Sequence, residues 1–114
     1  MKVQFSTATL LAASLTALLM TSPAHALDEE AAKALAKKND CFKCHAVDKT
    51  KKGPSYKKIA EKFKGKPDAE EKIIKNITTG PKVKLEDGSE EDHKIIDTKD
   101  KAELKNLIDW ILSR

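Results

Sequence analysis

The segment Cys41-Phe42-Lys43-Cys44-His45 decides how this chain folds, and it contains the only two cysteines of the sequence. Two cysteines three positions apart, followed at once by a histidine, are typical of the attachment site of a c-type haem. Each thiol can add to one haem vinyl group, and the imidazole of His45 then lies beneath the iron. Without the histidine, the cysteines would suit a redox dithiol or half of a zinc site, but zinc needs about four N or S ligands. We therefore expect one haem c, bound covalently through Cys41 and Cys44, with His45 as an iron ligand.

The first 26 residues have the layout of a secretory signal peptide. Lys2 gives a positive start, an apolar stretch follows at 10–20, and Ala24-His25-Ala26 offers a small-residue cleavage site. The apolar stretch is shorter than the roughly 20 residues that a membrane span needs, which argues against an uncleaved anchor. We expect cleavage after Ala26, export to the periplasm and a soluble mature domain at residues 27–114.

The composition limits the size of the domain and the kind of partner. The chain has 22 basic and 18 acidic residues, a net charge of +4, and only 4% aromatic residues. A mature chain of this length forms one small domain, which buries little apolar surface without an insert such as a haem. A single arginine and the lack of aromatic residues among the lysines argue against nucleic-acid binding. We interpret the lysines between Lys49 and Lys66 as a solvated surface on which acidic redox partner proteins could dock.

Helical periodicity dominates the rest of the chain, and no stretch alternates for long enough to predict a sheet. Acidic residues that suit helix N-termini precede apolar stripes, and Asp68 with Glu71 and Asp100 with Glu103 have the spacing of capping boxes. The predicted class is therefore all-α, with helices at about 28–40, 55–63, 68–79 and 100–113.

Two further features of the chain are the buried face of the first predicted helix and the length of the connection before the last helix. In the first helix, Leu27, Ala31, Ala34 and Leu35 are expected to share the buried face. The connection at 82–99 is polar and long for such a small domain, and long ordered loops are usually functional.

Three stretches of the chain, at 36–48, 52–60 and 107–113, resemble the small bacterial class I cytochromes c. This resemblance implies about four short helices wrapped around one covalent haem. It also implies that the carbonyl of Pro54 accepts a hydrogen bond from the second ring nitrogen of His45, which fixes the orientation of the imidazole. The first and last helices would cross at right angles, with Ala31 or Ala34 allowing the Trp110 region to pack closely.

The chain departs from this family at the second axial ligand of the iron. The family normally supplies a methionine from the loop before the last helix, but Met1 and Met20 both lie in the predicted signal peptide. His93 lies in that loop and is the remaining histidine of the expected mature chain besides His45. We therefore predict that His93 replaces the methionine and that the iron has two histidine ligands.

Two other interpretations of the sixth position remain open. His93 could be a solvated loop residue, which leaves the position open or occupied by water. Alternatively, Lys82, Lys84 or Lys94 could bind the iron, but an amine must first lose its proton.

The choice of axial ligand bears on function, because methionine with histidine raises the potential of a haem. A site with two histidines predicts a low-potential, single-electron carrier of the periplasm. We expect it to be a monomer or small oligomer that does not bind membranes once the signal is removed. The alternatives are a protein that binds or senses NO, CO or sulfide, and a haem subunit of a larger periplasmic complex. An enzyme is not predicted, because no distal acid–base group can be named.

Overall fold

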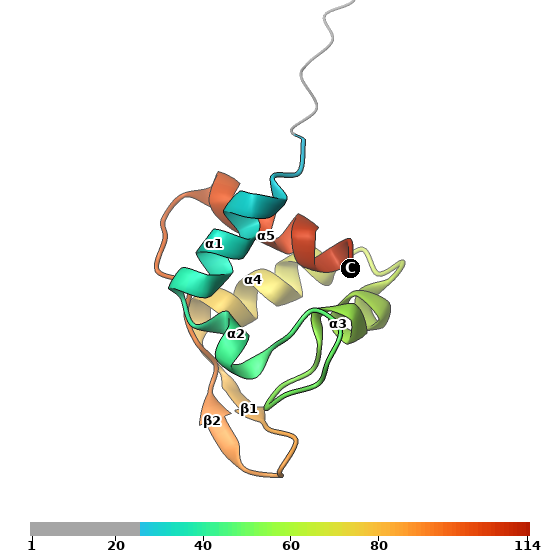
Figure 1. Cartoon of the computed structure of the whole chain (residues 1–114), viewed down its shortest axis with the longest axis vertical. Helices are drawn as coiled ribbons and strands as arrows, with labels where there is room; N and C mark the ends of the chain where they lie inside the picture. Colours follow the sequence, from blue (N-terminus) through green and yellow to red (C-terminus); the bar gives the residue numbers. More distant parts are fainter. Residues whose placement is uncertain (1–25) are drawn as a thin grey trace, which may run out of the picture.

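The structure, a computed structural model, describes residues 26–114, so the predicted signal peptide lies outside the described residues apart from Ala26. In the described part, helices and two short strands follow one another in the order α1 Glu29–Lys38, α2 Cys41–Cys44, α3 Tyr56–Phe63, α4 Ala69–Thr79, β1 Lys82–Lys84, β2 Glu90–Asp92 and α5 Lys101–Leu112 (Figure 1). Between residues 26 and 114, no helix has the length and apolar character needed to cross a membrane.

The four predicted helices are present as α1, α3, α4 and α5, and three of them begin after a capping side chain. The side chains of Asp28, Ser55 and Asp100 accept backbone N–H groups from the first turn at 2.9, 3.1 and 2.8 Å. These bonds satisfy donors that the start of a helix leaves without an intrahelical partner.

The capping boxes were predicted less well than the helices. Asp68 precedes α4 but makes no capping bond, and its carboxylate instead pairs with Lys72 at 2.6 Å. At α5, Asp100 caps the helix as expected, but Glu103 accepts from the hydroxyl of Thr98 at 2.7 Å. The hydroxyl of Thr98 in turn accepts the backbone N–H of Asp100 at 3.1 Å, so it completes the box in place of a direct bond.

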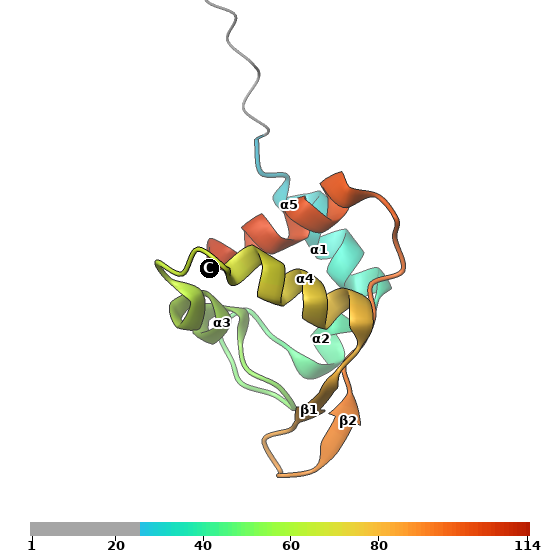
Figure 2. The ribbon, with the colours of Figure 1, turned by 180° about the vertical axis from the view of Figure 1, so that it is seen from behind.

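The predicted class is confirmed, since the described chain is mostly helical, but β1 and β2 add a small antiparallel hairpin that was not expected. Lys82 pairs with Asp92, and Lys84 pairs with Glu90. The hairpin turns at Gly88, whose φ of +87° favours glycine, and the Asp87 carboxylate accepts from both the N–H and the hydroxyl of Ser89. In both ribbon views the hairpin projects from the end of the domain opposite α1 and α5 (Figures 1 and 2).

The core is built where α1 and α5 cross (Figure 1). Trp110 and Ile108 of α5 are fully buried, and they pack with Ala32, Leu35 and Ala36 of α1. Small side chains four residues apart on α1 leave room for the large side chains of α5.

The expected buried face of α1 was therefore wrong in part. Leu27, Ala31 and Ala34 are exposed, and only Leu35 of the predicted set is buried. The start of α1 is instead fixed by Asn106 of α5, which exchanges two hydrogen bonds of 2.8 and 2.7 Å with the backbone of Asp28.

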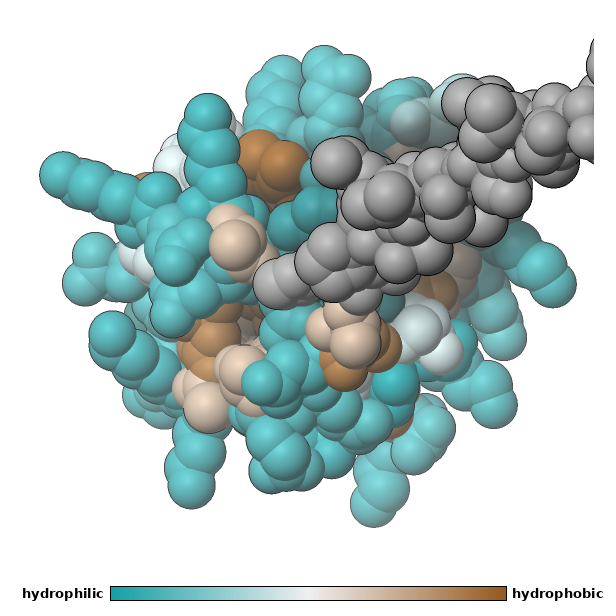
Figure 3. Space-filling model, turned by 90° about the horizontal axis from the view of Figure 1, so that it is seen from above, coloured by the Kyte–Doolittle hydropathy of each residue, from teal (hydrophilic) through white to brown (hydrophobic). Residues whose placement is uncertain are grey.

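The outer surface is largely polar. The space-filling view from above shows hydrophilic residues over most of the visible face, with hydrophobic residues in small, separate patches (Figure 3). Isolated apolar patches of this kind are normal for a small domain.

Candidate haem-binding site

The two cysteines lie on a single short helix, α2, that the sequence analysis did not predict. Asp40 starts it in the left-handed conformation with φ of 58°, which aspartate tolerates better than most residues. The N–H of His45 then closes the turn on the carbonyl of Cys41 at 2.9 Å. This turn carries Cys41 and Cys44 three residues apart, half-buried and not joined in a disulfide, so both thiols are available for attachment.

The ring of His45 is held by the segment that follows it. Its Nδ1 donates to the carbonyl of Pro54 at 2.6 Å, which is the hydrogen bond expected from the sequence. A second bond, from the N–H of Gly53 to the carbonyl of Cys44 at 2.8 Å, folds this segment back on the cysteine turn. Burial lowers the pKa of His45 and so favours the neutral imidazole, the form that binds metals. The atom left for a metal is Nε2.

Gly53 and Tyr56 also shape the site, and the sequence analysis did not assign them a role. A Cβ at Gly53 would lie 3.1 Å from Cε1 of His45, so a larger residue would crowd the imidazole. Tyr56 stacks on the His45 ring with centroids 5.3 Å apart and planes inclined by 20°. The signal was a glycine beside Pro54 and an aromatic residue two positions later, but only the fold shows what these residues contact.

His93 lies directly after β2 and faces His45. The centres of the two imidazole rings are 6.1 Å apart, and the ring planes are inclined by 45°. Nδ1 of His93 donates to the carbonyl of Lys94 at 2.8 Å. In both histidines Nδ1 is thus bonded to a backbone carbonyl, and Nε2 is the nitrogen left for another partner.

The hairpin carries His93 to this position through contacts at both of its ends. The N–H of His93 donates to the carbonyl of Pro81 at 2.9 Å, at the open end of the hairpin. Near the turn, the side chain of Leu85 is buried and the N–H of Glu86 donates to the carbonyl of Lys52 at 3.1 Å. The hairpin is therefore fixed to the loop that also orients His45.

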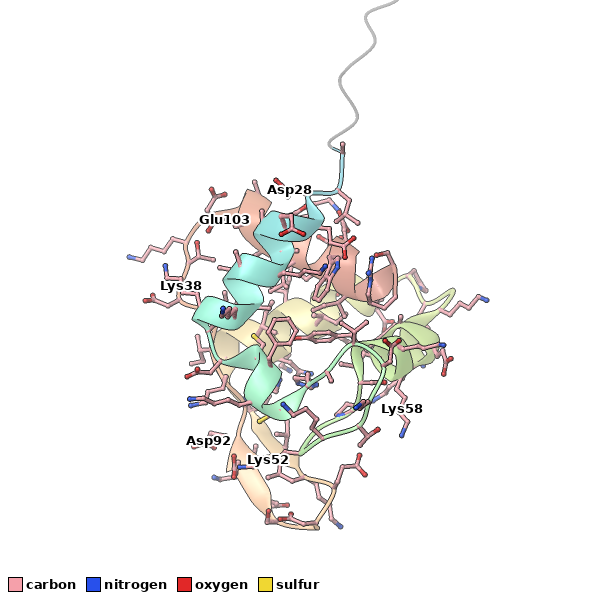
Figure 4. The ribbon with its side chains drawn as sticks, viewed as in Figure 1. Asp28, Lys38, Lys52, Lys58, Asp92 and Glu103 are labelled. Carbon is pink, nitrogen blue, oxygen red and sulfur yellow. The ribbon has the colours of Figure 1, made fainter. Side chains whose placement is uncertain are left out.

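The alternative lysine ligands lie on the outside of the hairpin and its continuation. Lys82 forms an ion pair with Asp92 at 3.0 Å, and Lys84 and Lys94 are exposed. Figure 4 shows Asp92 and Lys52 at the hairpin end of the domain, while Lys58 extends from α3.

Within residues 26–114, no three His, Cys, Asp or Glu side chains are grouped so that they could hold a metal ion. The residues present fit a haem, which needs two thiols and axial ligands, better than a metal held by the protein alone.

Comparison with known proteins supports this assignment. Residues 29–114 match the family model for cytochrome c. The chain is 38% identical over 65 residues to cytochrome c-551 of Pseudomonas aeruginosa, a match that spans 57% of this chain and 60% of that protein. It is 33% identical to cytochrome c-552 of Hydrogenobacter thermophilus, over 69% of this chain and 76% of that protein.

Solved structures show the same fold. The crystal structure of the class 1 cytochrome MtoD from Sideroxydans lithotrophicus ES-1 superposes with a TM-score of 0.73 and is 60% identical, covering 77% of this chain and 97% of that chain. The crystal structure of Nitrosomonas europaea cytochrome c552 gives a TM-score of 0.57 at 33% identity, over 71% and 96% of the two chains. The chain therefore belongs to the cytochrome c family, with its class I fold, and carries one haem c bound covalently through Cys41 and Cys44.

Proposed function

We propose that this protein is a periplasmic single-electron carrier whose haem iron is bound by His45 and His93. The observation that supports this most directly is the separation of 6.1 Å between the two imidazole centres. A metal–nitrogen bond of about 2 Å and about 1 Å from nitrogen to ring centre, counted on both sides, give a separation of about 6 Å. The two rings are therefore spaced as two axial ligands of one metal would be.

The backbone carbonyls behind the two imidazoles support the same assignment. Pro54 accepts from Nδ1 of His45, and Lys94 accepts from Nδ1 of His93. Such bonds hold a metal-binding histidine in one tautomer and raise the basicity of the other ring nitrogen. Both histidines thus present Nε2 as the ligand atom.

Electron transfer requires little of the chain besides holding its cofactor. The haem supplies an iron that changes oxidation state without a bond to substrate being made or broken. The chain would anchor the haem through Cys41 and Cys44 and orient the imidazole of His45, against which the buried ring of Tyr56 packs. This division of work needs no substrate pocket.

The ligand pair also bears on the potential of the iron. No methionine occurs between residues 26 and 114, so a thioether cannot occupy the sixth position of the mature chain. Since axial methionine raises the potential of a haem, a pair of imidazoles places this carrier at the low-potential side of its family.

Partners of this carrier are expected to be acidic proteins. The loop after His45, together with α3 and the turn that follows it, is rich in lysines that form no ion pair with any residue in 26–114. These are Lys49, Lys51, Lys57, Lys58, Lys62, Lys64 and Lys66, here called the basic surface. Thr50 in this loop is bridged to His45, so the basic surface begins next to the site. Positive charge beside a redox centre steers negatively charged partners toward it.

The experiment is a potentiometric titration of wild type, His93→Met and the neighbouring control Lys94→Met. Wild type should titrate as a reversible one-electron couple and remain low-spin in both oxidation states. His93→Met should have a higher midpoint potential, because a thioether favours ferrous iron more than an imidazole does. Lys94→Met should keep the wild-type value.

Equal midpoint potentials in all three proteins would show that His93 does not bind the iron. Rapid binding of CO by the reduced wild type would instead support a protein that binds small ligands, because a permanent sixth ligand must leave before CO can enter.

A further inference from the structure

We propose that Tyr56 is a positioning residue that fixes the plane of the His45 imidazole at the iron. The inference rests on the proposed role of His45 as an iron ligand, and it adds a residue that acts through His45. Tyr56 acts through its contact with the imidazole: the two rings are stacked, 5.3 Å between centroids and 20° between planes.

The hydrogen bond to Pro54 does not fix this plane by itself. An N–H group approaches a carbonyl oxygen over a broad range of directions, so the bond holds one edge of the ring and lets the ring rock about that edge. A second ring in nearly parallel contact opposes this motion, because rocking would drive one edge of the imidazole into it. Gly53 lies beside the same ring, since a Cβ there would be only 3.1 Å from Cε1 of His45.

Tyr56 can perform this role only if it is itself immobile. The whole residue is only 2% exposed. Trp110 meets its ring edge-on with centroids 5.2 Å apart, and Phe42 does so at 6.0 Å. Its backbone N–H donates to the carbonyl of Ala46 at 2.9 Å, which ties the start of α3 to the residue after His45. Fixed ring contacts and a fixed backbone therefore support the face that meets the imidazole.

The ring plane matters because it determines how the unpaired electron of ferric iron is distributed over the haem. The plane of an axial imidazole selects which iron orbital overlaps with its π-system, and the haem substituents along that direction receive the spin density. One fixed plane therefore gives one electronic structure of the oxidised protein. An imidazole that rocks between orientations would give a mixture of electronic structures.

The test uses the oxidised holoprotein in the His93→Ala background with cyanide bound to the iron. Cyanide is cylindrically symmetric, so the hyperfine shifts of the haem methyl protons in the NMR spectrum report the plane of His45 alone. Tyr56→Leu, which keeps an apolar side chain but removes the ring face, should change the order or the spread of the methyl shifts. Tyr56→Phe keeps the stacked ring and should preserve the shifts of the parent.

Trp110→Phe serves as the control for a general disturbance of the aromatic cluster. Trp110 is not stacked on His45, and phenylalanine keeps an aromatic ring beside Tyr56, so this variant should lower thermal stability while leaving the methyl shift pattern in place. If Tyr56→Leu yields no holoprotein, Tyr56→Met permits the same comparison with a more adaptable side chain.

The inference would be overturned by unchanged methyl shifts in the variant that lacks the ring, or by an equal change in Trp110→Phe. Because cyanide occupies the sixth position whichever group normally binds there, these outcomes are independent of His93. Failure of the two-histidine assignment would appear separately, in the potentials of wild type and His93→Met.

Discussion

At the scale of single residues, Gly80 controls where the His93 segment can lie. It ends α4 in the left-handed conformation with φ of +60°, and a Cβ there would be 2.9 Å from the carbonyl oxygen of His93. Side chains essentially never approach backbone this closely, so any other residue must displace the His93 segment. Gly80 thus serves two purposes: it ends α4 in the left-handed conformation, and its lack of a side chain leaves room for the backbone of the proposed iron ligand.

Gly80→Ala should loosen the bond between His93 and iron, and reduced protein should bind CO measurably faster than wild type. The matched control is Gly88→Ala at the hairpin turn, where φ is also positive, at +87°, but a Cβ would meet nothing within 4 Å. Both variants should lose about 1 kcal/mol of stability from backbone strain. Only Gly80→Ala should change the rate of CO binding in stopped-flow absorption, and equal rates in the two variants would refute the argument.

The residues of the proposed site differ in how far the sequence could predict them. The cysteines and His45 lie within one short motif, so their arrangement follows from local spacing. The proximity of His93 to His45 depends on 47 intervening positions and on a hairpin that was not predicted from the sequence. Only the lack of methionine in the mature chain pointed to His93, by elimination rather than by geometry.

At the scale of helices and strands, α5 and α4 differ in how their N-termini are capped. Asp100 caps α5 with a bond to the N–H of Ala102 at 2.8 Å, whereas Asp68 before α4 makes no such bond. Asp100→Ala should therefore lower the free energy of unfolding by about 1 kcal/mol. Asp68→Ala should cost less, because it removes only an exposed ion pair with Lys72, and exposed ion pairs contribute little to stability.

Denaturant unfolding of the two holoproteins, followed by circular dichroism, measures this difference. The same charge is lost at a helix start in both variants, so their comparison weighs the capping bond of Asp100 against the exposed ion pair of Asp68. A larger loss in Asp68→Ala than in Asp100→Ala would show that the ion pair, and not the cap, stabilises these helix starts.

Helices were predictable from the sequence and the hairpin was not, for a physical reason. A helix of ten residues shows its periodicity over several turns, and its caps are local. The strands of the hairpin have three residues each, too few to show alternation, although the Asp87-Gly88 pair is a common turn sequence. The buried face of α1 was also ambiguous, because alanines occur on several sides of this helix and α5 decides which of them are covered.

At the scale of the whole molecule, the distribution of charged side chains over the surface matters more for the encounter with redox partners than the net charge does. The basic surface includes Lys57, Lys58 and Lys62 of α3, which form no ion pair within residues 26–114. Other lysines do form ion pairs: Lys33 pairs with Glu29 at 2.7 Å, and Lys105 pairs with Asp109 at 3.0 Å. The lysines of α3 therefore carry positive charge that no ion pair neutralises within the described residues.

Oxidation of the reduced protein by hexacyanoferrate(III), an anion, should slow as ionic strength rises, because salt screens charges beyond about 10 Å at 0.1 M. Replacing three lysines of the basic surface by glutamine should reduce the low-salt rate more than replacing three paired lysines. The first set is Lys57, Lys58 and Lys62, and the second is Lys33, Lys72 and Lys105. Equal rates in the two triple variants would show that net charge alone governs the encounter.

The central claim is that His45 and His93 both bind the iron of one haem. Pulsed electron–nuclear double resonance on oxidised protein labelled with ¹⁵N-histidine measures this directly, because only nitrogen atoms bound to the iron show strong hyperfine coupling. Wild type should give couplings from two histidine nitrogens, and His93→Ala should give coupling from one. A single coupled histidine nitrogen in wild type would contradict the claim.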